Sequence, residues 1–174
     1  MDVSSPAFDR NGMIPAKYTC DGQGTNPPLR ITGVPGAAKT LALIVVDPDV
    51  ARSLKADGRY LHWALWNLPP TQSVVAEGSG GGISENGAGW IPACPPGEHR
   101  YVFEAFALDT SLRDARFSGE VELRQAMKGH VIDQAELVGR YAKGASKLSF
   151  ILPGILVLAA IALAYRLVFA RRSS

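Results

Sequence analysis

The sequence has no strong excess of charge of either sign. It contains 18 Lys and Arg residues against 16 Asp and Glu residues. Three arginines near the end of the chain, Arg166, Arg171 and Arg172, account for the small positive balance, and the rest is close to neutral. Nucleic-acid-binding domains need a basic patch or stripe. We therefore expect no nucleic-acid partner.

Common catalytic and metal-binding motifs are also missing. The chain has no GxSxG motif to position a nucleophilic serine, and no HxH or HExxH spacing typical of zinc ligands. It contains only three histidines. We therefore predict that the protein is not an enzyme and that it uses no cofactor and no metal ion. A hydrolase that uses Asp and His side chains, and a zinc site of the same residues, remain less favoured alternatives.

Cysteine is scarce, and the N-terminus does not have the pattern of a secretory signal peptide. Residues 1–15 lack a basic region followed by an apolar one, so we expect the domain to stay in the cytoplasm. The two cysteines, Cys20 and Cys94, both lie in turn-rich segments. They can form a disulfide in an oxidising compartment or remain thiols in the cytoplasm. The sequence leaves both alternatives open.

The longest apolar segment lies near the C-terminus. Residues 148–165 contain no charged side chain, and as a helix they span about 27 Å, close to the hydrocarbon thickness of a bilayer. This pattern predicts a transmembrane anchor over 148–170, after a domain of residues 1–145 and before a basic tail, 171–174. The alternative is a buried core helix. The anchor implies a single-pass membrane protein.

Most of the remaining chain has β-strand patterns. Apolar runs at 40–47, 60–69 and 100–109 are bounded by Pro, Gly and Asp, as strands are. Residues 118–144 read as one or two short amphipathic helices. Strands that come first and helices that come last argue against an alternating parallel α/β fold. We predict a mainly β protein, an antiparallel β-sandwich with short C-terminal helices, followed by the single transmembrane helix.

Polar side chains gather where these strands begin or end. Asp47 and Asp49 follow one strand, His62 lies in the next on the face of Ala64 and Trp66, and His99 and Tyr101 begin a third. Taken singly, Asp beside Pro is typical of a turn, and a lone strand histidine is typical of a core. Together they predict one pocket, because imidazole, phenol and turn amides bind phosphate or carboxylate groups, while aspartates orient histidines.

Five segments, in this order, resemble the phosphatidylethanolamine-binding protein family, and in particular its bacterial Raf-kinase-inhibitor-like branch. They are YTCDGQGTNPPL, KTLALIVVDPDV, LHWALWNLP, CPPGEHRYVFEAFALD and MKGHVIDQAELVGRY. The resemblance runs from about Phe8 to Tyr141. It implies a β-sandwich with an anion-binding pocket at one end. The residues that it assigns to this pocket are Asp47, Asp49, Tyr60, His62, Pro95, Pro96, His99 and Tyr101.

The chain departs from the usual family pattern near this pocket. Ala51 stands where the family usually has proline, and Ile91 and Pro92 stand at usual glycine positions. Outside the pocket segments, Thr32 replaces an aromatic residue. The side chains of Ile91 and Pro92, which are bulkier than glycine, are expected to reshape the pocket mouth.

The resemblance implies a non-enzymatic binding module. Its expected ligand is a phosphorylated or anionic small molecule, or a lipid head group such as phosphoethanolamine. The anchor expected above would tether this binding module to a membrane. Because family members also inhibit kinases or proteases, a protein target is the alternative function.

Overall fold

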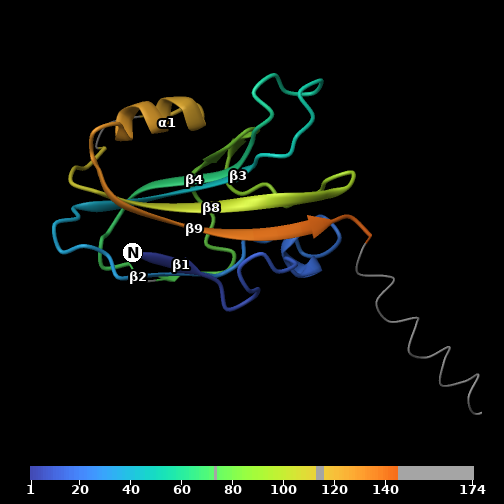
Figure 1. Cartoon of the computed structure of the whole chain (residues 1–174), viewed down its shortest axis with the longest axis horizontal. Coiled ribbons are helices and arrows are strands. Elements are labelled where there is room, and N and C mark those ends of the chain that lie inside the picture. The colour runs from blue at the N-terminus through green and yellow to red at the C-terminus, as the bar shows by residue number, and fades with distance from the viewer. Residues whose placement is uncertain (73, 113–115, 145–174) are drawn as a thin grey trace, which may run out of the picture. The chain divides into compact units, whose positions relative to one another are not determined.

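The computed structural model describes residues 1–72, 74–112 and 116–144. Figure 1 shows a mainly β protein, and residues Met1–Lys143 form one compact unit. The elements in chain order are β1 (Asp2–Ser4), the 3-10 helix η1 (Ala16–Tyr18), β2 (Leu29–Thr32), β3 (Thr40–Asp47), β4 (Tyr60–Leu68), β5 (Val74–Val75), β6 (Ile83–Ser84), β7 (Gly87–Ala88), β8 (Glu98–Leu108), α1 (Glu120–Met127) and β9 (Val131–Ala142).

The strands form two antiparallel sheets. The larger has the order β7-β6-β4-β3-β8-β9 and the smaller the order β1-β2-β5. In Figure 1, α1 lies over one face of the larger sheet, and β1 and β2 lie over the other. The described residues therefore form three layers, with the larger sheet in the middle.

The central strand β3 is buried along its whole length because both faces of its sheet are covered. Side chains of a strand point alternately to the two faces. On one face, β3 packs with Leu29 and Ile31 of β2, and on the other with Leu123 and Met127 of α1. This double coverage explains its uninterrupted apolar sequence, and each fully buried Leu, Ile or Val contributes roughly 1.5–3 kcal/mol. The β3 residues on the face toward β2 are Leu41, Leu43 and Val45. Those on the face toward α1 are Ala42, Ile44 and Val46.

Strand β4 contains a β-bulge at His62. The residues on either side of it, Leu61 and Trp63, pair with the consecutive residues Val46 and Val45, so His62 is an extra residue in β4. A bulge shifts the alternation of side chains by one position. The expectation that His62 shares a face with Ala64 and Trp66 is therefore wrong. The core cluster on the α1 side includes Leu61, Ala64 and Trp66 of β4.

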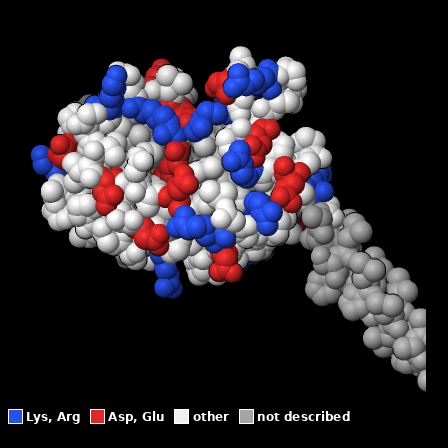
Figure 2. Space-filling view, viewed as in Figure 1, with Lys and Arg blue, Asp and Glu red and all other residues white. Residues whose placement is uncertain are grey.

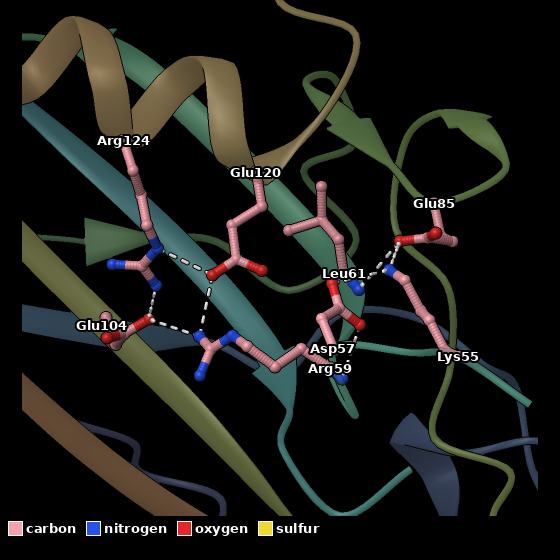
Figure 3. A network of polar contacts seen from close by, with 8 residues as sticks. All are labelled: Lys55, Asp57, Arg59, Leu61, Glu85, Glu104, Glu120 and Arg124. Carbon is pink, nitrogen blue, oxygen red and sulfur yellow. Dashed lines mark hydrogen bonds and ion pairs between the residues drawn. The ribbon is translucent and has the colours of Figure 1, made fainter. Parts of the chain in front are cut away.

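A network of ion pairs joins α1 to the sheet (Figure 3). The carboxylate of Glu120 accepts hydrogen bonds from Arg124 Nε at 2.7 Å and from Arg59 Nη2 at 2.8 Å. Glu104 of β8 pairs with the same two arginines, with its Oε2 at 3.9 Å from Arg59 Nη2. Charged side chains of both signs also intermingle on the face shown in Figure 2. The network adds fixed polar contacts to the apolar packing under α1.

The predicted helical segment 118–144 forms one helix, and its second half is a strand. Residues 120–127 are α1, but 131–142 form β9, the edge strand beside β8. Half of its residues, among them Ala, Glu, Gln, Leu and Arg, have good helix propensity, but pairing with β8 over the whole length of β9 decides its structure. The prediction of short C-terminal helices is corrected to one helix followed by one strand.

The transmembrane prediction also needs correction. No helix in residues 1–72, 74–112 and 116–144 is long and apolar enough to cross a membrane. The helix α1 has 8 residues and spans about 12 Å, against a hydrocarbon thickness of about 30 Å. The segment expected to span the bilayer, 148–170, lies outside the described residues. The expected anchor and the single-pass membrane location are therefore not retained.

Candidate functional site

A cavity of about 270 Å³ lies where β3 ends and where β4 and β8 begin. Neighbouring strands are antiparallel, so these three ends meet at the same edge of the larger sheet. The cavity brings together all eight residues that the sequence and the family resemblance assigned to a pocket. They are Asp47, Asp49, Tyr60, His62, Pro95, Pro96, His99 and Tyr101.

Asp47, the last residue of β3, forms hydrogen bonds both with the following turn and with His99. Its Oδ1 accepts a hydrogen bond from the backbone N–H of Asp49 at 2.8 Å. Its Oδ2 lies 2.6 Å from His99 Nδ1. An ionised carboxylate only accepts, so Nδ1 carries the proton of this bond. Asp47 is buried, and the turn role and the site role predicted for it coincide in one side chain.

Asp49 forms a two-pronged ion pair with Arg100 at the mouth of the cavity. Its Oδ2 accepts from the backbone N–H and from Nε of Arg100, both at 2.9 Å, and its Oδ1 accepts from Nη2 at 2.6 Å. Hydrogen bonds from the Arg100 side chain lower the pKa of Asp49 and keep it ionised. The pairing follows from the alternation of β8, whose His99 and Tyr101 line the cavity while Arg100 points elsewhere.

His62 is buried beside the cavity with one ring nitrogen already engaged. Its Nδ1 lies 2.7 Å from the carbonyl oxygen of Ile91, and because a carbonyl only accepts, Nδ1 is the donor. Burial lowers the pKa of His62, so the neutral ring with a free lone pair on Nε2 is favoured. Among the described residues Nε2 has no hydrogen-bond partner.

Two tyrosines flank His62. The ring of Tyr101 meets it edge-on at 5.1 Å between centroids, and the ring of Tyr60 lies at 5.2 Å. Burial raises the pKa of Tyr101, which keeps its phenol protonated and able to donate. Within the described part of the chain this hydroxyl has no hydrogen-bond partner. Tyr60 is more exposed, and its hydroxyl contacts Asn86 Oδ1 at 3.4 Å.

The proline-rich wall of the cavity is tied to the N-terminal part of the chain. Cys94 forms a disulfide with Cys20, with 5.3 Å between their Cα atoms. The backbone N–H of Cys20 also donates to the carbonyl oxygen of Ala93 at 3.0 Å. Pro95 and Pro96 follow directly, and their rings restrict the backbone. Of the two states that the sequence left open, the structure contains the disulfide.

Sequence reasoning missed much of the apolar lining of the cavity. Ile91 and Pro92, which were expected to reshape the pocket mouth, both line the cavity, but Val50 and Leu54 were not foreseen. Leu54, 81% exposed, lies at its mouth. Loop residues of this kind carry no chemical signal in a sequence, because scattered apolar side chains are normal on surfaces. The remaining lining residues that were not assigned are Val50, Ala51 and Cys94.

The residues that line the cavity offer little for metal or nucleophilic chemistry. In the part of the chain that the structure describes, no group of three or more His, Cys, Asp or Glu side chains could hold a metal ion. The described lining contains no serine or threonine, and its cysteine is part of the disulfide. What the site can offer is a phenol donor, two imidazoles and two carboxylates that already have partners.

Comparison with known proteins gives consistent matches over this domain. The sequence model of the phosphatidylethanolamine-binding protein family matches residues 4–142. A UPF0098 protein of Chlamydia trachomatis is 45% identical over 149 residues, which cover 82% of this chain and 99% of the relative. A UPF0098 protein of Methanothermobacter thermautotrophicus is 39% identical over 156 residues, which cover 83% of this chain and 100% of the relative.

Solved structures agree with these matches. The crystal structure of a phosphatidylethanolamine-binding protein homolog from Chlamydia trachomatis has a TM-score of 0.76 and 42% identity, and the match covers 80% of this chain and 95% of that one. An Escherichia coli member of the mammalian family has a TM-score of 0.72 and 25% identity, with 80% and 96% covered. By sequence and by fold, the chain belongs to the phosphatidylethanolamine-binding protein family.

Proposed function

We propose that the protein is a non-enzymatic binding module whose cavity takes a small phosphate-like anion, either free or as the head group of a larger molecule. The observation that carries this proposal is the convergence of Tyr101, His62 and His99 on one cavity, each with a polar atom that has no hydrogen-bond partner among the described residues. Buried polar groups are normally hydrogen-bonded. A ligand that pairs with these atoms satisfies them.

The size and walls of the cavity support a small ligand. Its volume of about 270 Å³ is near the lower end of the range for small-molecule sites, roughly 300–1,000 Å³. The walls from Ile91 and Pro92 and the exposed Leu54 at the mouth are apolar. Such walls exclude water from the polar groups at the base and strengthen their interaction with an anion.

The pairing of the two carboxylates also favours an anionic ligand. An isolated carboxylate in the cavity would repel phosphate, but Asp47 is directed at His99 and Asp49 at Arg100. The carboxylates therefore orient their partners. Catalysis of hydrolysis is less favoured, because the raised pKa of Tyr101 makes it a poor nucleophile and the described lining offers no aliphatic hydroxyl.

The test is an NMR titration of the full chain, in which the ring signals of the histidines are followed. Phosphate, phosphoethanolamine and a short-chain phosphatidylethanolamine are added separately. We expect saturable shifts of the His62 and His99 signals. His130, an exposed residue that pairs with Asp109, serves as the internal control. Binding of all three ligands indicates the phosphate group alone, and binding of the lipid alone indicates a lipid head group.

A matched pair of variants makes the result specific to the cavity. Tyr101→Phe removes the proposed donor, and since a hydrogen bond to a charged group contributes about 1.5–3 kcal/mol, the affinity is expected to fall by a factor of ten or more. Tyr18→Phe, which removes a phenol paired with Glu77 outside the cavity, should bind as the wild type does. Unmoved His62 and His99 signals with all three ligands would overturn the proposal.

A further inference from the structure

The cavity has polar groups at its buried end and apolar side chains toward its exposed end. His62 and Tyr101 are buried. Ile91 and Pro92, which also line the cavity, are half-buried, and Leu54 at the mouth is 81% exposed. Buried polar groups need hydrogen-bond partners, so the polar part of a ligand is expected at the buried end. The rest of that ligand then lies against apolar side chains.

The apolar wall is fixed to the polar base by hydrogen bonds in both directions. The backbone N–H of Ile91 donates to the carbonyl oxygen of His62 at 2.9 Å, and the Ile91 carbonyl accepts from His62 Nδ1 at 2.7 Å. Pro92 lies close to Gly24, where an added Cβ would be 3.4 Å from Cγ of the proline ring. A wall held in this way costs little to order when a ligand binds.

Leu54 is held at the mouth by a loop with its own hydrogen bonds. The backbone N–H groups of Leu54 and Lys55 donate to the carbonyl oxygen of Ala51, at 2.8 and 3.1 Å. The N–H of Gly58 donates to the Lys55 carbonyl at 2.9 Å. The Lys55 ammonium pairs with Glu85 at 2.7 Å and so ties the loop to the turn after β6 (Figure 3). The loop therefore keeps an apolar side chain at the mouth although that side chain is exposed.

Asp49 and Tyr60, two polar residues toward the exposed end, already have partners. Both oxygens of Asp49 accept hydrogen bonds from Arg100, and the Tyr60 hydroxyl contacts Asn86 Oδ1 at 3.4 Å. A polar substituent of a ligand has to compete with these contacts. An apolar substituent gains by leaving water and needs no such exchange. The mouth therefore favours an apolar substituent.

We propose that the cavity binds phosphate esters that carry an apolar substituent, with the phosphate at the buried polar end and the substituent against Leu54, Ile91 and Pro92. This inference rests on the proposed function and names its ligand class. Monoesters and diesters both belong to this class. A diester needs only one apolar substituent, and its other one, such as ethanolamine, can stay in solvent. The apolar substituent can belong to a lipid or to a soluble ester.

The first comparison is between ethyl phosphate and butyl phosphate, in NMR titrations of the full chain followed at the His62 and His99 ring signals. The two esters have the same charge and the same phosphate group, and they differ by two methylenes. Complete burial of one methylene raises affinity about fourfold. Butyl phosphate is therefore expected to bind about four- to fifteenfold more tightly, the lower value corresponding to half burial.

The second comparison separates a lipid from a soluble ester. Glycerophosphoethanolamine and dihexanoyl phosphatidylethanolamine share a phosphodiester head group, and only the second has acyl chains. The lipid is used below its critical micelle concentration. A gain in affinity for the lipid alone assigns the substituent to acyl chains, and a gain for butyl phosphate alone assigns it to a soluble ester. A gain in both comparisons means that the apolar character alone is recognised.

Leu54→Ser is the informative variant, and because Leu54 is exposed, its replacement should not disturb folding. It should lower the gain in affinity by at least about twofold. Leu54→Ser/Ile91→Ala should bring the affinities within each pair of ligands close together, and circular dichroism checks that this double variant folds. Val121→Ser is the matched control, because Val121 is 77% exposed on α1 and does not line the cavity. It should keep the wild-type gain.

The outcomes separate the two proposals. If none of the phosphate compounds binds, the proposed function fails. If they bind but neither comparison shows a gain, the anion site stands and the inference about the substituent is wrong. A gain that persists unchanged in Leu54→Ser overturns the inference as well. If the double variant does not fold, Leu54→Ser and its control decide the question alone.

Discussion

The charge at the mouth of the cavity depends on a single ion pair. Asp49 would add an unpaired negative charge there, and Arg100 neutralises it with two guanidinium contacts and one backbone contact. This pair is partly exposed, with 28% of the Asp49 side chain and 58% of the Arg100 side chain accessible. Its effect on binding an anion is therefore expected to exceed its effect on stability.

Replacing Arg100 by Ala should raise the pKa of Asp49 toward its ordinary value of about 3.9, since the hydrogen bonds that lower it are lost. Because the folded pKa is below the unfolded one, the pair adds stability above pH 3.9, and this contribution disappears as the pH falls through the lowered value. Wild type and variant should differ by less than about 1 kcal/mol near neutral pH and converge in acid. Urea unfolding of both proteins, near neutral pH and in acid, measures this difference in the free energy of unfolding.

Arg30→Ala is the control for that experiment. Arg30 is exposed on β2 and forms no ion pair with any described residue. Its removal changes the net charge equally and should leave the pKa of Asp49 where it is. A difference between wild type and Arg100→Ala that persists unchanged in acid would contradict the assignment of the pair.

At the scale of elements, the strands that sequence reasoning located well are those buried in the larger sheet. The predicted strands 40–47, 60–69 and 100–109 correspond to β3, β4 and β8 within a residue or two. Their apolar runs end at Pro, Gly or Asp, which interrupt regular pairing. Strand β9 was missed because its sequence mixes the helix formers Ala, Glu, Gln and Arg with Val and Ile, and so is also compatible with a helix. Only its long-range partner β8 distinguishes the two.

The attachment of α1 gives a prediction at the same scale. Glu120 is 12% exposed and lies between two guanidiniums, so Glu120→Gln removes one of the two carboxylates that both arginines contact and leaves them only Glu104. We expect a loss of about 1–2 kcal/mol in the free energy of unfolding, between the values for exposed and for buried pairs. Urea unfolding of the variant checks this value.

Glu136→Gln is the matched control for Glu120→Gln. Glu136 is exposed on β9, and its side chain has no hydrogen-bond or ion-pair partner among the described residues. This variant should unfold within about 0.5 kcal/mol of the wild type. An equal effect of the two substitutions would mean that the network in Figure 3 contributes nothing specific to holding α1.

At the scale of the molecule, the polar part of the site could be predicted and its walls could not. Asp47, His62 and His99 stand at strand ends, and antiparallel strands bring such ends together whatever the loops do. The positions of Ile91 and Leu54 depend on how the connecting loops fold back over that edge. No local pattern determines that path, and the disulfide to Cys20 is one of the contacts that set it.

The disulfide is also expected to stabilise the whole domain. It joins residues separated by 74 positions, and cross-linking a loop of this length removes much conformational freedom from the unfolded chain. The double variant Cys20→Ser/Cys94→Ser should lose roughly 2–4 kcal/mol of stability. Urea unfolding with and without reductant tests this, because reductant should destabilise the wild type and leave the variant unchanged. Equal stability of the oxidised wild type and the variant would contradict it.

The bulge in β4 has a consequence for how this protein can change by insertion or deletion. Because His62 is the extra residue between two paired positions, losing it would leave Leu61 and Trp63 adjacent, still paired with Val46 and Val45 and still facing opposite sides of the sheet as they do now. The packing of β4 on both faces is therefore compatible with either length of the strand. A descendant can lose the cavity histidine by deletion of one residue without rebuilding its core.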